Sequence, residues 1–478
     1  MPFKLPLYRH IPAPAGGAPA ILERLKALPC PFLLDTGMLV EGLGHHSFVG
    51  SDPFLVLKAR GQQITVTEGD KSSVYNGDPM VELGKLLARY KLPVAPGPYP
   101  FNGGAVGYFS YDLGRRFEVI PSLAVDDLAT PDLCLGFYDV VVAVDVRTGE
   151  VTVISTGLPE RGSAAVVRAQ ERLATVTGLL TAQPSSSGGA VVLVCDGKTG
   201  GLVSNFTPDA YREAVQRAVD YIYAGDIFQV NISQRFSAPQ VVDAWSLYTR
   251  LRKINPAPFA AFLSYDDLEV ISASPERFLK LEGSRVETCP IKGTRPRGRT
   301  PEDDEFLRQE LLDSEKDRAE LMMIVDLERN DLGRVCEVGS VKVPELYRLE
   351  EYATVFHLVS TVEGRLHPEK DITDLLAASF PGGSITGAPK IRAMEIIEEM
   401  EPVRRGVYTG SIGYISFDGR VDLNIVIRTI LATKGNFYFQ VGGGITADSD
   451  PQREYVETLD KARALVRALG LEKSEHGF

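Results

Sequence analysis

Hydrophobic and polar positions along the chain repeat with two different periods, which divide it into helices and strands. Apolar residues three or four positions apart predict helices at 21–28, 164–179 and 208–224, and a last helix from Pro451 to about Leu469. Alternation and short apolar runs predict strands at 140–145, at 150–155 and across 269–288, with a turn at Glu282-Gly283-Ser284. Helices and strands do not alternate regularly, so the pattern favours an α+β fold over a doubly wound sheet.

Capping and turn residues add boundaries to this pattern. Thr300 followed by Pro301 and an acidic residue is typical of a helix start, and Ser314 followed three positions later by Asp317 restarts the helix. The stretch 408–441 alternates like a β-meander, with turns at Asp418-Gly419 and Lys434-Gly435-Asn436.

Two stretches far apart in the chain resemble each other. Residues 104–112 (GAVGYFSYD) and 410–418 (GSIGYISFD) match at five of nine positions. Two explanations account for the match equally well. One is convergent strand-turn composition, and the other is a distant duplication, which would put the same β-hairpin in two halves of one fold.

The composition changes most abruptly at 184–189 (PSSSGG), where small polar residues suit a flexible connection. We therefore predict an N-terminal region over 1–185, a linker over 184–204 and a domain over 205–470 that carries the chemistry.

Composition and charge limit the classes of function. With 478 residues, 44% of them hydrophobic, the chain can bury a large core, and its formal net charge of −12 argues against nucleic acid or an anionic membrane as a partner. The five cysteines include no C-x-x-C pair, which argues against a disulfide framework or a zinc knuckle and fits a reducing compartment. No signal-like N-terminus and no run of roughly 20 apolar residues occurs. We expect a soluble, cytoplasmic protein.

Three residues of the last predicted helix, Glu454, Glu457 and Lys461, share one face because they are three and four positions apart. A solvated salt-bridge stripe explains this spacing. The glycines at 442–444 precede the helix and let backbone amides approach a ligand carboxylate, so a cation between these carboxylates and an anionic substrate explains it too.

Glu320 is flanked by apolar residues, and a buried carboxylate needs a cationic or hydrogen-bonding partner. A structural ion pair with Arg318 or Arg329 and oxygen ligation of magnesium are both open.

Two further features fit an anionic substrate. The glycine-rich stretch 380–390 does not match the phosphate-loop pattern, so a carboxylate-binding turn that includes Thr386 is the better interpretation. Arg428 is predicted on a strand over 421–430, on the same side as Asp422, where it would hold a carboxylate or pair with Asp422.

Lys292 lies in a tight turn, Pro290-Ile-Lys-Gly-Thr294, followed by Arg295 and Arg297. The two like charges are expected to lower the pKa of the lysine and so to favour the nucleophilic free amine. An ordinary exposed loop lysine is the alternative.

These stretches, in this order, resemble the chorismate-utilising enzymes. The motifs are DIFQV (226–230), SPERF (274–278), PIKGT (290–294), DLERNDLGR (326–334), HLVS (357–360), the stretch 380–394 and GGGITADS (442–449). The resemblance implies two antiparallel sheets packed orthogonally and flanked by helices, in four layers α/β/β/α.

The resemblance also assigns roles to residues. It implies magnesium ligands at Glu320 and Glu457, with Glu454 nearby, and a histidine near the reacting ring at His357. The implied substrate-holding positions are Thr294, Thr386, Tyr408, Arg428, Gly442, Gly443, Gly444 and Lys461.

Two positions select a reaction within the family. Gln229 stands where relatives that add water to chorismate have a lysine base, which argues against hydration. Lys292 is characteristic of the aminodeoxychorismate synthase component I branch, whereas anthranilate synthases usually have alanine there. The resemblance therefore implies amination of chorismate at C4 on the route to 4-aminobenzoate and folate, with Lys292 as nucleophile and Glu276 as acid.

Ammonia needs a source. No cysteine lies in a G-x-C-x-G nucleophile elbow, so the resemblance implies a separate glutamine amidotransferase subunit in a heterodimer. The rival interpretations are anthranilate synthase component I and a non-catalytic, amino-acid-binding regulatory relative.

Some members of the family bind tryptophan in the N-terminal part, which here points to Asp35 and Thr36. The sequence Leu33-Leu34-Asp35-Thr36 departs from the Leu-Leu-Glu-Ser typical of feedback-regulated members, which argues against feedback inhibition.

Overall fold

The computed structural model describes residues 5–94, 99–182, 201–266, 268–352 and 355–471. Most of the predicted linker lies outside these residues. The division into a region over 1–185 and a domain over 205–470 stays a prediction, although each of the two large sheets takes strands from both sides of that boundary.

Each sheet has twelve strands in the described part of the chain, and every strand pair within it is antiparallel. The first sheet, in spatial order, is β1 (Leu7–Ile11), β10 (Val151–Ser155), β9 (Val140–Asp145), β3 (His46–Gly50), β2 (Phe32–Asp35), β13 (Phe259–Tyr265), β14 (Leu268–Ser274), β23 (Thr429–Thr433), β24 (Asn436–Ile445), β12 (Gln229–Pro239) and β11 (Val203–Ser204), with β20 (Gly387–Ala388) also paired to β12. The second is β17 (Ile291–Pro296), β19 (Val355–Arg365), β16 (Arg285–Cys289), β15 (Arg277–Glu282), β22 (Val421–Asn424), β21 (Ser411–Ser416), β7 (Gly104–Phe109), β8 (Leu133–Tyr138), β4 (Leu55–Arg60), β5 (Gln63–Glu68) and β6 (Lys71–Asn76), with β18 (Lys342–Glu351) paired to β19.

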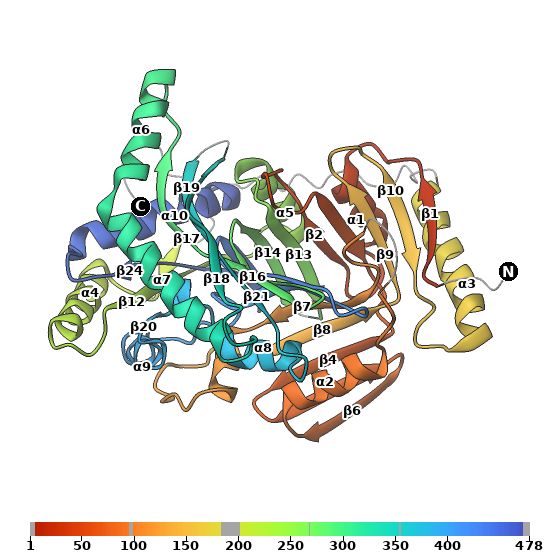
Figure 1. Ribbon diagram of the computed structural model, residues 1–478. Coiled ribbons are helices and arrows are strands. Elements are labelled where there is room, and N and C mark those ends of the chain that lie inside the picture. The colour runs from red at the N-terminus through yellow and green to blue at the C-terminus, as the bar shows by residue number, and fades with distance from the viewer. Residues whose placement is uncertain (1–4, 95–98, 183–200, 267, 353–354, 472–478) are drawn as a thin grey trace.

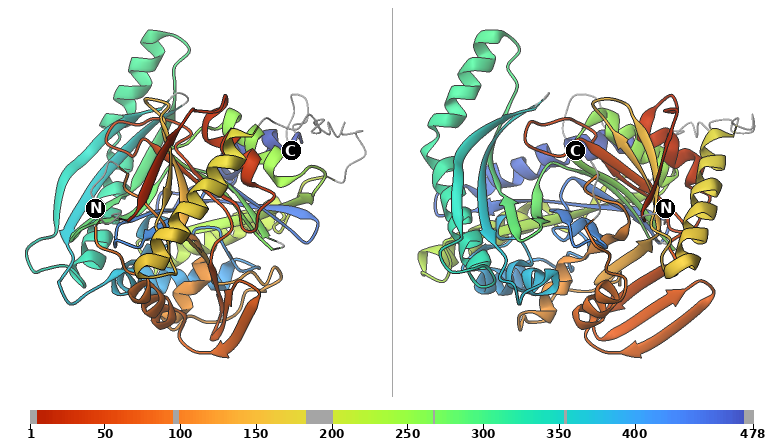
Figure 2. Two further views of the ribbon diagram at one scale, coloured as in Figure 1. Left: turned by 90° about the vertical axis from the view of Figure 1, so that its right-hand side faces the viewer. Right: turned by 45° about the vertical axis from the view of Figure 1, so that its right-hand side comes forward.

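Helices cover the outer faces of the two sheets (Figures 1 and 2). They are α1 (Gly17–Leu25), α2 (Pro79–Arg89), α3 (Gly162–Thr181), α4 (Pro208–Tyr223), α5 (Ala244–Ile254), α6 (Pro301–Asp313), α7 (Glu315–Gly333), α8 (Ile372–Ser379), α9 (Lys390–Met400) and α10 (Pro451–Leu469), with 3-10 turns η1 (Tyr111–Arg116) and η2 (Gly383–Ile385). Among the described residues, no helix is long and apolar enough to cross a bilayer.

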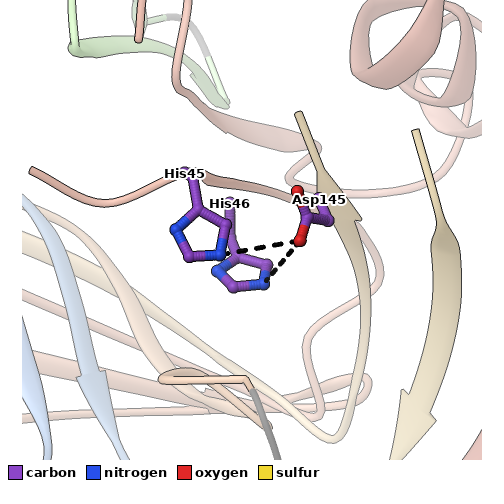
Figure 3. Close-up of side chains that lie close together, drawn as sticks. All are labelled: His45, His46 and Asp145. Carbon is purple, nitrogen blue, oxygen red and sulfur yellow. Dashed lines mark ion pairs between the residues drawn. The ribbon is translucent and has the colours of Figure 1, made fainter. Parts of the chain in front are cut away.

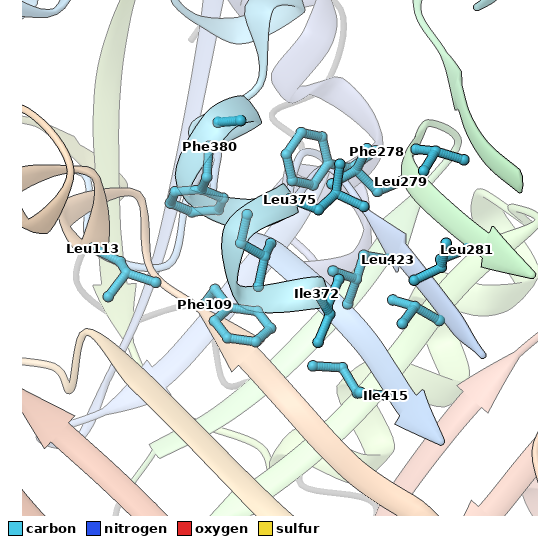
Figure 4. Close-up of a cluster of buried hydrophobic side chains, with 14 of the residues drawn as sticks. Phe109, Leu113, Phe278, Leu279, Leu281, Ile372, Leu375, Phe380, Ile415 and Leu423 are labelled. Atoms are coloured by element: carbon cyan, nitrogen blue, oxygen red, sulfur yellow. The ribbon is translucent and has the colours of Figure 1, made fainter. Parts of the chain in front are cut away.

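Aromatic side chains fill the space between the sheets. Phe32 of the first sheet meets Tyr138 of the second edge-on, with ring centroids 4.6 Å apart, and Phe48 meets Tyr414 at 5.8 Å. Such large buried rings dominate core energetics. A separate apolar cluster lies between the second sheet and its helices, where Figure 4 shows residues of α8 against the strands. The four-layer fold implied by the resemblance is thereby confirmed.

The two resembling stretches lie side by side. β7 pairs with β21 so that Gly107 faces Gly413. The order of strands is the same in the two halves. Strands β2 to β5 correspond to β13 to β16, and β7 to β10 correspond to β21 to β24. A helix follows the last strand of each half, α3 in the first and α10 in the second. This repeated topology favours the duplication over convergent composition.

Most of the predicted elements are confirmed. The strand over 140–145 matches β9, the helix over 208–224 matches α4 to within a residue, and α10 spans 451–469 as predicted. The side chains of Thr300 and Ser314 accept the expected capping bonds from Asp303 N and Asp317 N. The first predicted helix was displaced, since α1 begins and ends several residues earlier.

One prediction about the strands was wrong. The stretch 408–441 is not a single meander, because β22 belongs to the second sheet and β23 to the first. Residues 425–427 between them are Ile-Val-Ile and lie against both cores, so the crossing leaves no break in the apolar pattern. The predicted turns at 418–419 and 434–436 are where expected.

The contact between the halves can be tested at Gly107. A Cβ built there lies 1.9 Å from Cys134 O, so Gly107→Ala should lower the free energy of unfolding by about 3 kcal/mol through overpacking. Gly178→Ala in α3 is the control, since no atom lies within 4 Å of its Cβ and alanine favours helix. Urea unfolding followed by circular dichroism measures both, and equal stabilities would contradict the steric account.

Candidate active site

Most of the candidate residues gather where β12 and β24 of the first sheet approach β17 and β19 of the second, with α7 and α10 beside them (Figure 1). Lys292 lies on β17 of the second sheet, and its Nζ approaches the first sheet. A Cβ built on Gly444 of β24 lies 3.5 Å from this nitrogen.

A β-bulge beside Lys292 sets the direction of its side chain. The pairing of β17 with β19 shifts register between Lys292 and Thr294, and Gly293 between them has a φ of 75°. Bulges of this kind redirect a side chain next to a functional site. Lys292 Nζ donates to Ser384 O at 3.3 Å.

The pKa of Lys292 is lowered, chiefly by burial, with Lys461 acting in the same direction. The predicted cause was wrong. Arg295 is paired with Glu310 and Asp317, and Arg297 with Asp304, so carboxylates take up both guanidinium charges.

Glu276 lies between β14 and β15 and is only 5% exposed. Burial raises the pKa of its carboxyl to about 7, against the opposing effects of the Ser384 hydroxyl and the Lys292 ammonium. Glu276 and Lys292 therefore share Ser384 as a neighbour, and both are shifted toward their neutral forms.

His357 lies on β19 next to the bulge. Its Nδ1 is 3.0 Å from Thr294 Oγ1, and its ring stands edge-on to Tyr352 with centroids 4.8 Å apart. Burial and the nearby Arg428 lower its pKa to about 4, so the imidazole is neutral at physiological pH.

The glycines of β24 face the acidic side of α10. A Cβ built on Gly443 lies 3.2 Å from Glu454 Oε2, 3.5 Å from Glu457 Oε1 and 3.7 Å from Lys461 Nζ. Lys461 Nζ pairs with Glu457 at 2.7 Å and donates to Gly442 O at 2.8 Å. The helical spacing thus places these side chains over the glycine strand, and they do not form a stripe remote from it.

Glu320 on α7 makes neither of the ion pairs weighed from the sequence. Arg318 stacks on Tyr347 and Arg329 pairs with Asp326, whereas Glu320 is 3.8 Å from Lys316. Burial raises the pKa of its carboxyl, which the Lys292 charge opposes and the Glu457 charge reinforces.

These carboxylates fit a magnesium ion. Glu320 is partly buried and pairs at 3.8 Å with the exposed Lys316, and Glu457 pairs with Lys461. The Glu457 charge acts on Glu320 from α10, so a cation between the two carboxylates would relieve their repulsion. Magnesium typically takes one or two protein carboxylates and fills its remaining positions with water and substrate oxygens.

Arg428 does not lie on a strand, contrary to the prediction. β22 ends at Asn424, and Arg428 sits in the crossing to β23 with a φ of 52°. Asp422 is paired with Arg277. Among the described residues Arg428 has no ion-pair partner, and burial lowers its pKa, so the guanidinium can receive an anion.

Tyr408 and Thr386 line the inner side of the same region. Tyr408 is buried, which raises the pKa of its hydroxyl, and Arg428 lies near enough to oppose that rise. Thr386 is fully buried and its hydroxyl donates to Gly382 O at 2.9 Å, so it holds the η2 turn in shape.

Two buried polar side chains also lie here: Gln229, which the sequence related to the type of reaction, and Asn231, which the sequence did not single out. Gln229 Oε1 and Asn231 Oδ1 on β12 are buried without a hydrogen-bond partner among the described residues. Gln229 Nε2 is 2.3 Å from a Cβ built on Gly444, and Asn231 Oδ1 is 3.0 Å from one on Gly442. Unsatisfied buried acceptors beside a glycine strand call for a ligand that donates hydrogen bonds.

Asp35 and Thr36 line a separate pocket between the sheets, together with His46, Phe48 and Tyr414. The Asp35 carboxylate is already occupied there. It accepts from Tyr248 at 2.8 Å and Ser47 at 3.1 Å and pairs with Arg252.

Known proteins share the fold and much of the sequence. A family model described as chorismate binding enzyme matches residues 43–467. The chain belongs to the chorismate-binding enzyme family.

Individual members of the family agree over most of their length. Aminodeoxychorismate synthase component 1 of Salmonella typhimurium is 44% identical over 443 residues, which cover 92% of this chain and 93% of that protein. Anthranilate synthase component 1 of Thermus thermophilus is 45% identical over 409 residues, which cover 84% of this chain and 86% of that protein. The crystal structure of anthranilate synthase component I from Streptococcus pneumoniae superposes with a TM-score of 0.77 at 32% sequence identity. The superposition covers 90% of this chain and 94% of that one. Identity alone does not separate the two activities.

The raised pKa of Glu276 predicts a pH-dependent stability difference. The folded carboxyl binds its proton more tightly than the unfolded one, so this contribution is present below about pH 4.5 and is lost as pH rises through about 7. Glu276→Gln should therefore be more stable than the unchanged protein at pH 8, by about 3 kcal/mol, and similar to it at pH 4.5.

Urea unfolding at several pH values measures this difference. Glu369→Gln, at an exposed position, is the matched control and should show no such trend. A Glu276→Gln difference that stays constant from pH 4.5 to 8 would contradict a protonated buried carboxyl.

Proposed function

We propose that this chorismate-utilising enzyme aminates C4 of chorismate to give 4-amino-4-deoxychorismate, through a covalent intermediate on Lys292. The observation that carries the proposal is the pairing of a lysine of lowered pKa with a carboxyl of raised pKa across Ser384. A neutral amine is the nucleophilic form, and a neutral carboxyl is the form that can donate a proton.

In the first step, the lone pair of Lys292 Nζ forms a bond to C2 of chorismate. The two ring double bonds shift, the bond from C4 to its hydroxyl breaks, and Glu276 protonates the hydroxyl, which leaves as water. In the second step ammonia attacks C4, the double bonds shift back and the bond from C2 to Nζ breaks. Glu276 takes up the proton that the new amine releases, so the enzyme is restored.

The remaining residues bind and orient the substrate in this proposal. Arg428, without a carboxylate partner, suits one of the two substrate carboxylates, and Lys461 with the amides of 442–444 suits the other. Tyr408, Thr386 and Thr294 border the same space, and neutral His357 stands beside Thr294 to contact the ring.

Magnesium held by Glu320 and Glu457, with Glu454 nearby, would supply positive charge at the ring carboxylate. The acceptors Gln229 Oε1 and Asn231 Oδ1 are available to a hydroxyl or to incoming ammonia. Gln229 in place of a lysine base disfavours the attack of water.

Anthranilate synthesis is the rival activity, because an anthranilate synthase component 1 is as similar to this chain as an aminodeoxychorismate synthase component 1. That reaction adds ammonia at C2 and eliminates pyruvate, and it has no use for a nucleophile at position 292. A non-catalytic role does not explain a buried carboxyl brought together with a half-buried lysine and a half-buried guanidinium from separate elements.

Product identification by liquid chromatography and mass spectrometry tests the proposal. The unchanged protein with chorismate, magnesium and ammonia should form 4-amino-4-deoxychorismate. Lys292→Ala should lower the rate at least about a hundredfold, because it removes the nucleophile.

Lys280→Ala, on the surface of β15, is the matched control and should keep full activity. Intact-mass analysis with peptide mapping of stalled enzyme should place a chorismate-derived adduct on Lys292. Anthranilate as the product would assign the rival activity, and no turnover at any ammonia concentration would favour the non-catalytic role.

We also propose that a separate glutamine amidotransferase subunit supplies the ammonia, as the designation component 1 of the relatives suggests. Glutamine alone should support no activity of the purified chain. Adding the amidotransferase subunit should make glutamine as effective as ammonia at a several-fold lower concentration. Steady-state assays with and without that subunit measure this, and an unchanged glutamine response would exclude the heterodimer.

The pocket around Asp35 and Thr36 is our candidate for binding an aromatic amino acid such as tryptophan. Its aromatic walls suit an indole, but Asp35 has no free charge for the ligand ammonium. Calorimetry with L-tryptophan tests the pocket, and activity at saturating tryptophan tests whether binding regulates the enzyme. We expect no feedback inhibition.

A further inference from the structure

His45, His46 and Asp145 lie close together (Figure 3), and none of them is among the residues assigned to catalysis. Asp145 Oδ2 is 3.6 Å from His45 Nε2 and 4.0 Å from His46 Nε2. Among the described residues, this is the one trio of histidine, cysteine or acidic side chains whose ligand atoms all lie within 4.8 Å of one another.

The backbone holds two of these side chains on the same face. His46 opens β3 and Asp145 closes β9, and the two are directly opposite each other in the antiparallel pairing. Cross-strand partners of this kind have adjacent side chains. His45 precedes the strand, and its ring packs on that of His46 with centroids 4.2 Å apart.

The Asp145 carboxylate is oriented toward the histidines. Its Oδ1 accepts from Arg147 N at 2.8 Å and Thr148 N at 3.2 Å. The other oxygen, Oδ2, is the one that faces both imidazoles. One oxygen therefore anchors the side chain while the other is left for a ligand.

We propose that His45, His46 and Asp145 form a binding site for a divalent transition-metal ion of the zinc class, with three protein ligands and one open position. Two imidazoles and one carboxylate suit zinc and its neighbours and do not suit magnesium, which prefers oxygen ligands. Bonds of about 2.1 Å in a tetrahedral site would put ligand atoms about 3.4 Å apart, so small side-chain rotations close the observed gaps.

The Arg147 side chain competes with the ion, and its Nε also lies 3.9 Å from Asp145 Oδ1. Arg147 Nη2 is 2.8 Å from His45 Nε2, which is the nitrogen that would bind the metal. The Arg147 side chain is 59% exposed, so it can swing into solvent when an ion enters. An ion here would join β3 to β9 and would border the pocket that His46 also lines.

The test is calorimetric titration of the full-length protein with Zn²⁺ in excess Mg²⁺, which keeps the acidic residues near Gly443 occupied. The unchanged protein should bind one Zn²⁺ at this site with a Kd in the micromolar range or below. His46→Asn and Asp145→Asn should each weaken binding at least about tenfold, because each removes a ligand. Arg147→Gln should tighten binding, because it frees His45 and removes a positive charge.

His367→Asn, at an exposed histidine elsewhere, is the matched control and should leave the affinity unchanged. If His46→Asn fails to fold, His45→Asn replaces it, since His45 lies at the surface. Co²⁺ in place of Zn²⁺ gives a second readout, because histidine ligation produces visible absorption that the same variants should abolish. A Kd weaker than about a millimolar, or equal Zn²⁺ affinity in the histidine variants, would overturn the proposal.

Discussion

The pairing of β7 with β21 is the constraint on which the rest of the structure depends. At this joint Gly107 faces Gly413, and a Cβ on either residue would strike a carbonyl of the next strand, Cys134 O or Asp422 O. Because neither residue has a side chain, the two halves share the second sheet without interruption, and β2 with β13 joins them in the first. Both halves therefore enclose one aromatic core between the sheets.

The halves differ in what each inserts between its matching strands. Between β5 and β7, the described residues of the first half form β6 and α2 and no other helix or strand. The second half has all the elements from β17 to α9 between β16 and β21. Lys292, Glu320, His357 and Thr386 all lie in that insertion. The duplicated sheets thus serve as a frame that also carries Glu276, Arg428 and the carboxylates of α10, and the insertion that only one half has adds the proposed nucleophile Lys292.

A buried ion pair ties this insertion to the frame. The side chains of Arg405 and Glu401 are 1% and 2% exposed, and Arg405 Nη2 lies 2.7 Å from Glu401 Oε1. Arg405 also donates to Asn231 O and Ile385 O, while Glu401 accepts from Ser233. Removing one partner of such a pair typically costs about 3–5 kcal/mol because a charge is left buried alone. Strand β12, the η2 turn and the approach to Tyr408 therefore hold a fixed geometry.

Local signals in the sequence predicted much of this molecule, and the misses have a common cause. Capping residues located α6 and α7, and helical spacing placed Glu454, Glu457 and Lys461 together. Contacts between distant segments escaped prediction: the crossing before Arg428 and the orphaned acceptors on β12. Each depends on which strand or helix lies opposite, which no periodicity records.

The environment of Lys292 shows why that distinction matters for the proposed chemistry. Two arginines nearby in sequence are paired with carboxylates and are not among the main causes of its lowered pKa, of which burial is the largest. The same burial raises the pKa of Glu276 to about 7. A dry environment favours the neutral forms of both groups at once, and the free amine with the protonated acid is the one combination that the proposed first step requires. The closing of the two sheets over these side chains therefore shifts both pKa values toward the neutral forms together.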